Sequence, residues 1–78
     1  MHTWNRTDKF AIRTDRIGGI EIADMTADRS VYLQPGDSAA EFMFRAERIA
    51  ACFHHDNQDA AFDRLCDPYT NVMQEIVA

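Results

Sequence analysis

The chain has 78 residues, of which 46% are hydrophobic and 27% charged, and its formal net charge is −5. This length accommodates one domain with a modest core, and the composition excludes a disordered or collagen-like chain. The sequence holds no run of 18 apolar residues and no apolar stretch of the signal-peptide kind at its N-terminus. We therefore expect a cytoplasmic protein with no membrane span.

The segment 8–34 has the alternating pattern of short β-strands. Apolar side chains alternate with more polar ones at Phe10, Ile12, Ile20, Ile22, Val31 and Leu33. Gly18 and Gly19 mark a turn, and Pro35 ends the third run because proline cannot donate to a sheet. The pattern predicts a three-stranded antiparallel meander with one buried face. Residues 1–7 lie outside it, as a segment that can be flexible.

The segment 37–77 has the period of helices. Ser38 and Glu41 form a capping-box pattern, with Asp37 as a competing N-cap, so one long helix is expected from there to about His54. Its core-facing stripe consists of Ala39, Phe42, Met43, Ala46, Ile49, Ala50 and Phe53.

Shorter helices are expected after this long one. Residues 58–66 have helical spacing, and Asp67 followed by Pro68 is typical of an N-cap and first helical position. The alternative is a single helix kinked at Pro68. The sequence thus predicts a single α+β domain over residues 1–78, with a three-stranded antiparallel β-meander followed by one long helix and one or two short C-terminal helices.

The long helix has a second apolar patch that faces away from its core stripe. Ala40, Phe44 and Ala51 form this patch, and Glu47 and Arg48 lie at its rim. The C-terminal helices could cover Phe44 within the chain. Alternatively, the patch is an interface for a protein partner or for a second copy of the chain, since exposed aromatic residues often anchor interfaces.

The net charge lies entirely in the second half, where residues 37–78 hold eight carboxylates against three arginines. Direct binding of nucleic acid through a basic field is therefore not expected. Asp56, Asp59, Asp63 and Asp67 form an acidic surface. It is either a solvated helix face or part of an acidic inhibitor that imitates nucleic acid and occludes a nucleic-acid-binding partner.

Cys52, His55 and Cys66 are the weak candidates for a metal site or a catalytic centre. Only Cys52 and His55 have a spacing used by zinc ligands, and Cys66 has no matching neighbour. The chain has neither a G-x-S-x-G elbow nor a phosphate-binding loop. We expect no metal, no cofactor and no catalytic residue, and we keep a zinc protein or enzyme as the third alternative.

These patterns together favour a small non-catalytic cytoplasmic protein that acts through protein–protein contact. The contact would use the apolar patch of the long helix and the acidic second half. The acidic inhibitor is the second alternative.

Overall fold

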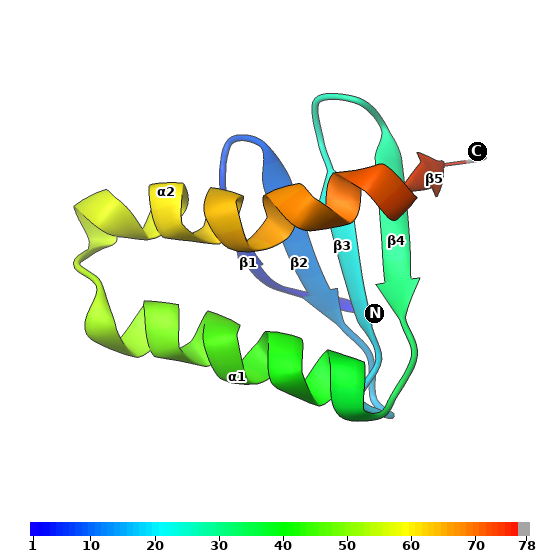
Figure 1. Ribbon diagram of the computed structural model, residues 1–78, viewed down its shortest axis with the longest axis horizontal. Coiled ribbons are helices and arrows are strands. Elements are labelled where there is room, and N and C mark those ends of the chain that lie inside the picture. Colours follow the sequence, from blue (N-terminus) through cyan, green and yellow to red (C-terminus); the bar gives the residue numbers. More distant parts are fainter. Residues whose placement is uncertain (77–78) are drawn as a thin grey trace.

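The computed structural model describes residues 1–76. The elements in chain order are β1 (His2–Arg6), β2 (Phe10–Thr14), β3 (Ile20–Asp24), β4 (Arg29–Leu33), α1 (Asp37–Cys52), α2 (His55–Cys66), the 3₁₀ helix η1 (Asp67–Val72) and β5 (Gln74–Glu75). In Figure 1 the two α-helices run in opposite directions and are joined at the end that projects beyond the sheet. The architecture is therefore α+β, with an antiparallel sheet followed by helices. None of the helices in this part of the chain is long and apolar enough to cross a membrane.

The sheet has the order β1-β2-β3-β4-β5, and every neighbouring pair is antiparallel. Its N-terminal meander has four strands, so the prediction of three was wrong by one. The missing strand is β1, whose five residues include Trp4 as the one apolar side chain and therefore show no alternation. A register shift between Thr3 and Asn5 also interrupts its pairing with β2. β5 adds two residues at the other edge, beside β4.

The helices begin and end at other residues than predicted. α1 starts at Asp37 after Gly36, and no side chain caps it, so the expected capping box does not form. It ends at Cys52, and α2 starts three residues earlier than expected. At Asp67 α2 passes directly into η1, with Pro68 in its first turn. The last predicted helix is thus a 3₁₀ helix that ends at Val72, and its expected final residue, Val77, lies outside the described part.

The core lies between one face of the sheet and the two helices. Register places Ile12 opposite Ile22, and Ile22 opposite Val31, so these apolar side chains share a face. The buried cluster on that face consists of Phe10, Ile12, Ile20, Ile22, Ala39, Phe42, Ala46, Phe62, Cys66 and Met73. Burial of each large apolar side chain contributes about 1.5–3 kcal/mol, so this cluster holds both helices on the sheet.

The predicted core stripe of α1 is buried only in its first part. Ala39, Phe42 and Ala46 are fully buried, whereas Ala50 is exposed and Phe53 is 41% exposed. Figure 1 gives the reason, because the last turns of α1 extend past the edge of the sheet and have no strand beneath them. The helix end that the sheet leaves uncovered is available to form other contacts.

The turn between β2 and β3 depends on a close approach at Gly19. The carboxylate of Asp15 accepts hydrogen bonds from the backbone N–H groups of Ile17 and Gly19, at 3.1 and 2.6 Å. The Tyr32 hydroxyl donates to the other oxygen of the same carboxylate. A Cβ atom at Gly19 would lie 1.9 Å from that hydroxyl, so a side chain at this position requires Tyr32 to move.

Candidate functional site

A groove of about 690 Å³ lies between α1 and α2. Only two residues connect the helices, and this short connection makes them antiparallel neighbours. The small side chain of Ala61 is 5% exposed and lies at the contact between them. The groove is lined by Glu41, Phe44, Arg45, Arg48, Ile49, Phe53, Ala61, Arg64 and Leu65.

The apolar part of the groove continues from the protein core to the surface. Ile49 and Leu65 are half-buried and pack against the core cluster. Phe44 is 62% exposed and Phe53 41% exposed, so two aromatic rings border the groove in contact with water. A contiguous apolar surface with a polar rim is typical of an interaction site, whereas single exposed apolar residues are common on protein surfaces.

The charged part of the groove is mostly basic. Arg45 donates to Glu41, one turn earlier on α1, with 2.8 Å between Nη2 and Oε1. The guanidinium of Arg48 lies over the ring of Phe44, 5.8 Å from its centroid, in a cation–π arrangement. Within residues 1–76 neither Arg48 nor Arg64 forms an ion pair. All three arginines of the acidic second half thus line this one groove, where they outnumber carboxylates three to one.

The structure places two of the five predicted interaction residues in the groove, namely Phe44 and Arg48. Ala40, Glu47 and Ala51 are exposed, but they are not among the residues that line it. Successive residues of an α-helix are 100° apart, so these three lie on the side of Phe44 that faces away from α2. The groove is therefore displaced around α1 relative to the predicted interaction patch.

The groove also has residues that the sequence analysis missed. They are Glu41, Arg45 and Ile49 on α1, Phe53 in the connection between the helices, and Ala61, Arg64 and Leu65 on α2. Ala61, Arg64 and Leu65 have the three- and four-residue spacing of a shared helix face, which was a usable signal. Their pairing with Phe44 depends on how α2 docks on α1, and the pattern of either helix alone does not contain that information.

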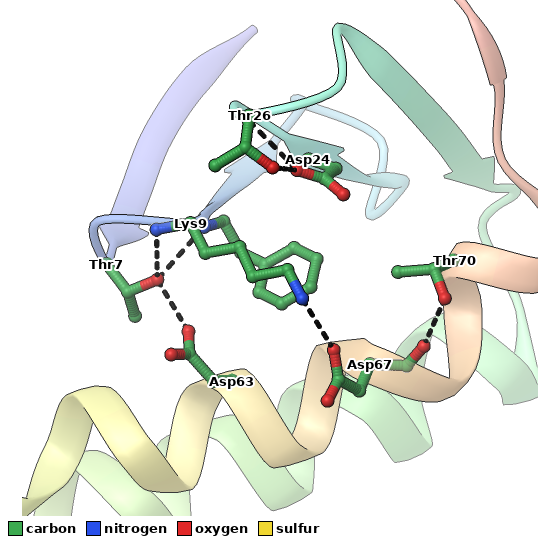
Figure 2. A network of polar contacts seen from close by, with 8 residues as sticks. Thr7, Lys9, Asp24, Thr26, Asp63, Asp67 and Thr70 are labelled. Atoms are coloured by element: carbon green, nitrogen blue, oxygen red, sulfur yellow. Dashed lines mark hydrogen bonds and ion pairs between the residues drawn. The ribbon is translucent and has the colours of Figure 1, made fainter.

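The predicted acidic surface is divided between two environments. Asp63 accepts a hydrogen bond from Thr7, with 2.7 Å between the oxygens, and Asp67 pairs with Lys9 at 3.2 Å. Figure 2 shows both carboxylates directed toward the segment that joins β1 to β2. Asp56 and Asp59 are exposed. Half of the predicted acidic row therefore links the end of α2 and the start of η1 to the segment between β1 and β2.

The structure separates the cysteine and histidine candidates. Cys52 is exposed in the last turn of α1, whereas Cys66 is fully buried at the opposite end of α2. His55 and Cys66 are eleven positions apart along α2, which is about 16 Å at 1.5 Å per residue. Zinc ligands lie only about 2.0–2.3 Å from the metal, so these positions do not converge on one ion. Among the side chains that the structure describes, no three metal-binding residues gather at one point.

The environment of Cys66 fits a structural role. Burial, reinforced by the nearby carboxylates of Asp63 and Asp67, raises the pKa of its thiol to about 12. A thiol with this pKa carries almost no thiolate at neutral pH, and the thiolate is the reactive form. Cys66 therefore acts as a small apolar residue in the core.

Comparisons with known proteins do not extend this description. Scans of protein-family models, curated proteins and solved structures found no match to the chain.

Proposed function

We propose that this chain is a small non-catalytic protein that works by binding another protein chain in the groove between α1 and α2. The observation that carries the proposal is the 62% exposure of Phe44 beside an apolar surface that continues into the core. Full burial of a phenylalanine side chain contributes about 1.5–3 kcal/mol, and a partner that covers this ring would gain part of it.

The composition of the groove supports the same function. Aromatic residues and arginine are enriched in the centres of protein interfaces, where a few side chains supply most of the binding free energy. Phe44 and Phe53 are aromatic anchors of this kind, and Arg48 stacks on the first of them. Stacking also keeps the Arg48 side chain ordered before a partner arrives, which lowers the entropic cost of binding.

An acidic protein that imitates nucleic acid receives less support from the same residues. Such a protein needs carboxylates in a row that a basic partner can reach. Asp63 and Asp67 are engaged with Thr7 and Lys9, and Arg64 lies between them along α2. This alternative predicts binding that weakens steeply with salt and does not depend on Phe44.

The test compares Phe44→Glu with Ala40→Glu. Both positions are exposed on α1 and both variants add one negative charge, but only Phe44 lines the groove. Partners are captured from the native host with the wild-type chain, identified by mass spectrometry, and purified for titration calorimetry. We expect Phe44→Glu to weaken binding by at least tenfold and Ala40→Glu to leave it within about twofold, since tenfold corresponds to about 1.4 kcal/mol.

Circular dichroism and the fluorescence of Trp4 establish that both variants are folded. Equal affinity of Phe44→Glu and the wild type for the purified partner would refute the proposal. Phe44→Ser is the second variant if Phe44→Glu does not fold, because it removes the ring without adding a charge. Sedimentation at several concentrations determines whether the partner is a second copy.

A further inference from the structure

We infer that the partner is an acidic amphipathic helix from a different polypeptide, seated lengthwise between α1 and α2. This inference rests on the proposed function and specifies the chemistry of the partner. The apolar side chains of that helix would cover Phe44, Ile49 and Leu65. Its carboxylates would pair with Arg48 and Arg64, one on each wall of the groove.

The shape of the groove favours a helix. Its wall on α1 extends from Glu41 to Ile49, which is about 12 Å along the helix axis at 1.5 Å per residue, and Phe53 borders the groove just beyond the end of α1. A partner helix of about 8 residues has the same length as this wall. Two antiparallel helices leave a furrow between their ridges, and a third helix fills it with side chains spaced at i, i+3 or i+4, and i+7.

The charge of the groove favours carboxylates on that helix. Arg48 and Arg64 contribute two positive charges that no acidic side chain of residues 1–76 neutralises by an ion pair, whereas Arg45 is already paired with Glu41. A basic helix would place like charges together as water leaves the interface, which costs free energy. An acidic helix satisfies both guanidinium groups, and arginine pairs with a carboxylate through two parallel hydrogen bonds.

The same charges argue against a second copy of this chain as the occupant. Two copies that meet through this groove around a two-fold axis would present the same surface to each other. Each groove carries three arginines against one glutamate, so two surfaces of net positive charge would meet. A different polypeptide, with acidic residues along the edges of its helix, would avoid this repulsion between like charges.

The test is a selection with the full chain as bait. Displayed peptides of about 16 residues keep leucine at i, i+3, i+7 and i+10, and all other positions are randomised among glutamate, lysine, glutamine and serine. We expect the enriched peptides to carry glutamate next to the leucines. The best of them is then synthesised with its glutamates and again with lysine at the same positions, and both are titrated by fluorescence anisotropy.

Reversal of the groove charge should reverse the preference of the chain for the glutamate peptide over the lysine peptide. In the double variant Arg48→Glu/Arg64→Glu, we expect the glutamate peptide to bind at least tenfold more weakly and the lysine peptide to bind more tightly than to the wild type. Arg6→Glu/Arg16→Glu changes the net charge equally at exposed positions outside the groove and should leave both affinities within about twofold. Circular dichroism melts check folding, and Arg48→Gln/Arg64→Gln is the substitute if the reversed variant unfolds.

The possible results distinguish failure of this inference from failure of the proposed function. If both peptides bind equally and Phe44→Glu abolishes both interactions, the acidic partner is refuted while the groove remains the binding site. If no enriched peptide depends on Phe44, the inference and the proposed function both fail. If the wild-type chain sediments as a dimer that Phe44→Glu dissociates, the occupant is a second copy and the inference is refuted.

Discussion

The indole ring of Trp4 meets the ring of Phe62 edge-on, with centroids 6.0 Å apart and an interplanar angle of 80°. Phe62 is 1% exposed in the core, and Trp4 is half-buried on β1. The contact therefore joins the first strand to α2, the helix that forms one wall of the groove. The shape of the candidate site depends on a strand whose sequence contains almost no β-strand signal.

Trp4→Ala should lower the free energy of unfolding by about 2–3 kcal/mol, since it removes a large half-buried aromatic side chain and its contact with Phe62. Trp4→Phe retains an aromatic ring and should cost less than half as much. Urea unfolding followed by circular dichroism measures both. A loss below about 0.5 kcal/mol for Trp4→Ala, the size of an ordinary surface substitution, would mean that β1 contributes little to the fold.

A second connection between α2 and the sheet runs through Thr7, which is 6% exposed. Its hydroxyl donates to Asp63 and accepts the backbone N–H groups of Lys9 and Phe10, at 3.1 and 2.9 Å (Figure 2). Thr7→Val keeps the shape but leaves these partners unsatisfied, so we expect a loss of about 1–3 kcal/mol in denaturant unfolding. Thr7→Ser preserves the hydroxyl and should cost less than half of the valine substitution. Equal losses for the two variants would assign the effect to packing.

Gly19→Ala should be destabilising for a steric reason. The new Cβ atom would lie 1.9 Å from the Tyr32 hydroxyl and 2.5 Å from an oxygen of Asp15, so the tyrosine must move; forced overpacking costs about 1–3 kcal/mol. In a Tyr32→Ala background the collision with the tyrosine disappears and only the contact with Asp15 remains, so the same glycine substitution should cost less. A double-mutant cycle from thermal melts measures this coupling. Additive effects would show that Gly19 is required for another reason.

The sequence predicts those parts of the fold that have their own periodicity. Ile12, Ile22 and Val31 alternate with less apolar residues, and the three strands that carry them are present in the structure. β1 has no such alternation, because its place in the sheet depends on pairing with β2 and on the contact of Trp4 with α2. Tertiary contacts of this kind leave no periodic pattern in the strand itself.

The candidate site was predictable only on one of its walls. The pattern of α1 shows that Phe44 lies away from the core stripe, and this ring is indeed exposed. The pattern of α1 does not show against which side of this helix α2 packs. Ala61 and Leu65 line the groove together with Ile49, so the groove lies on one side of Phe44 and excludes Ala51 on the other.

Acid should destabilise the protein through two carboxylates in its turns. Hydrogen bonds from Thr26 lower the pKa of the buried Asp24, and the Tyr32 hydroxyl lowers that of Asp15, both from an ordinary value of 3.8. Because folding favours the charged forms, their stabilisation is present above about pH 4 and is lost as the pH falls through the lowered pKa values. Melting temperatures between about pH 6 and about pH 2.5 should show this loss. Asp24→Asn, which keeps an acceptor oxygen, should melt with a shallower dependence on acid; an unchanged slope would exclude Asp24 as a source.

The two cysteines should react with a thiol reagent at very different rates. Cys52 is exposed, whereas Cys66 is fully buried and burial raises its pKa to about 12, so about one Cys66 thiol in 10,000 is ionised at pH 8. We expect the native protein to release one equivalent of the chromophore of a disulfide reagent quickly, and the second only after addition of denaturant. Cys52→Ser should remove the fast equivalent and leave the slow one. Two fast equivalents in the native state would show that the end of α2 opens readily, and the groove would then lack the rigid wall that the proposed binding requires.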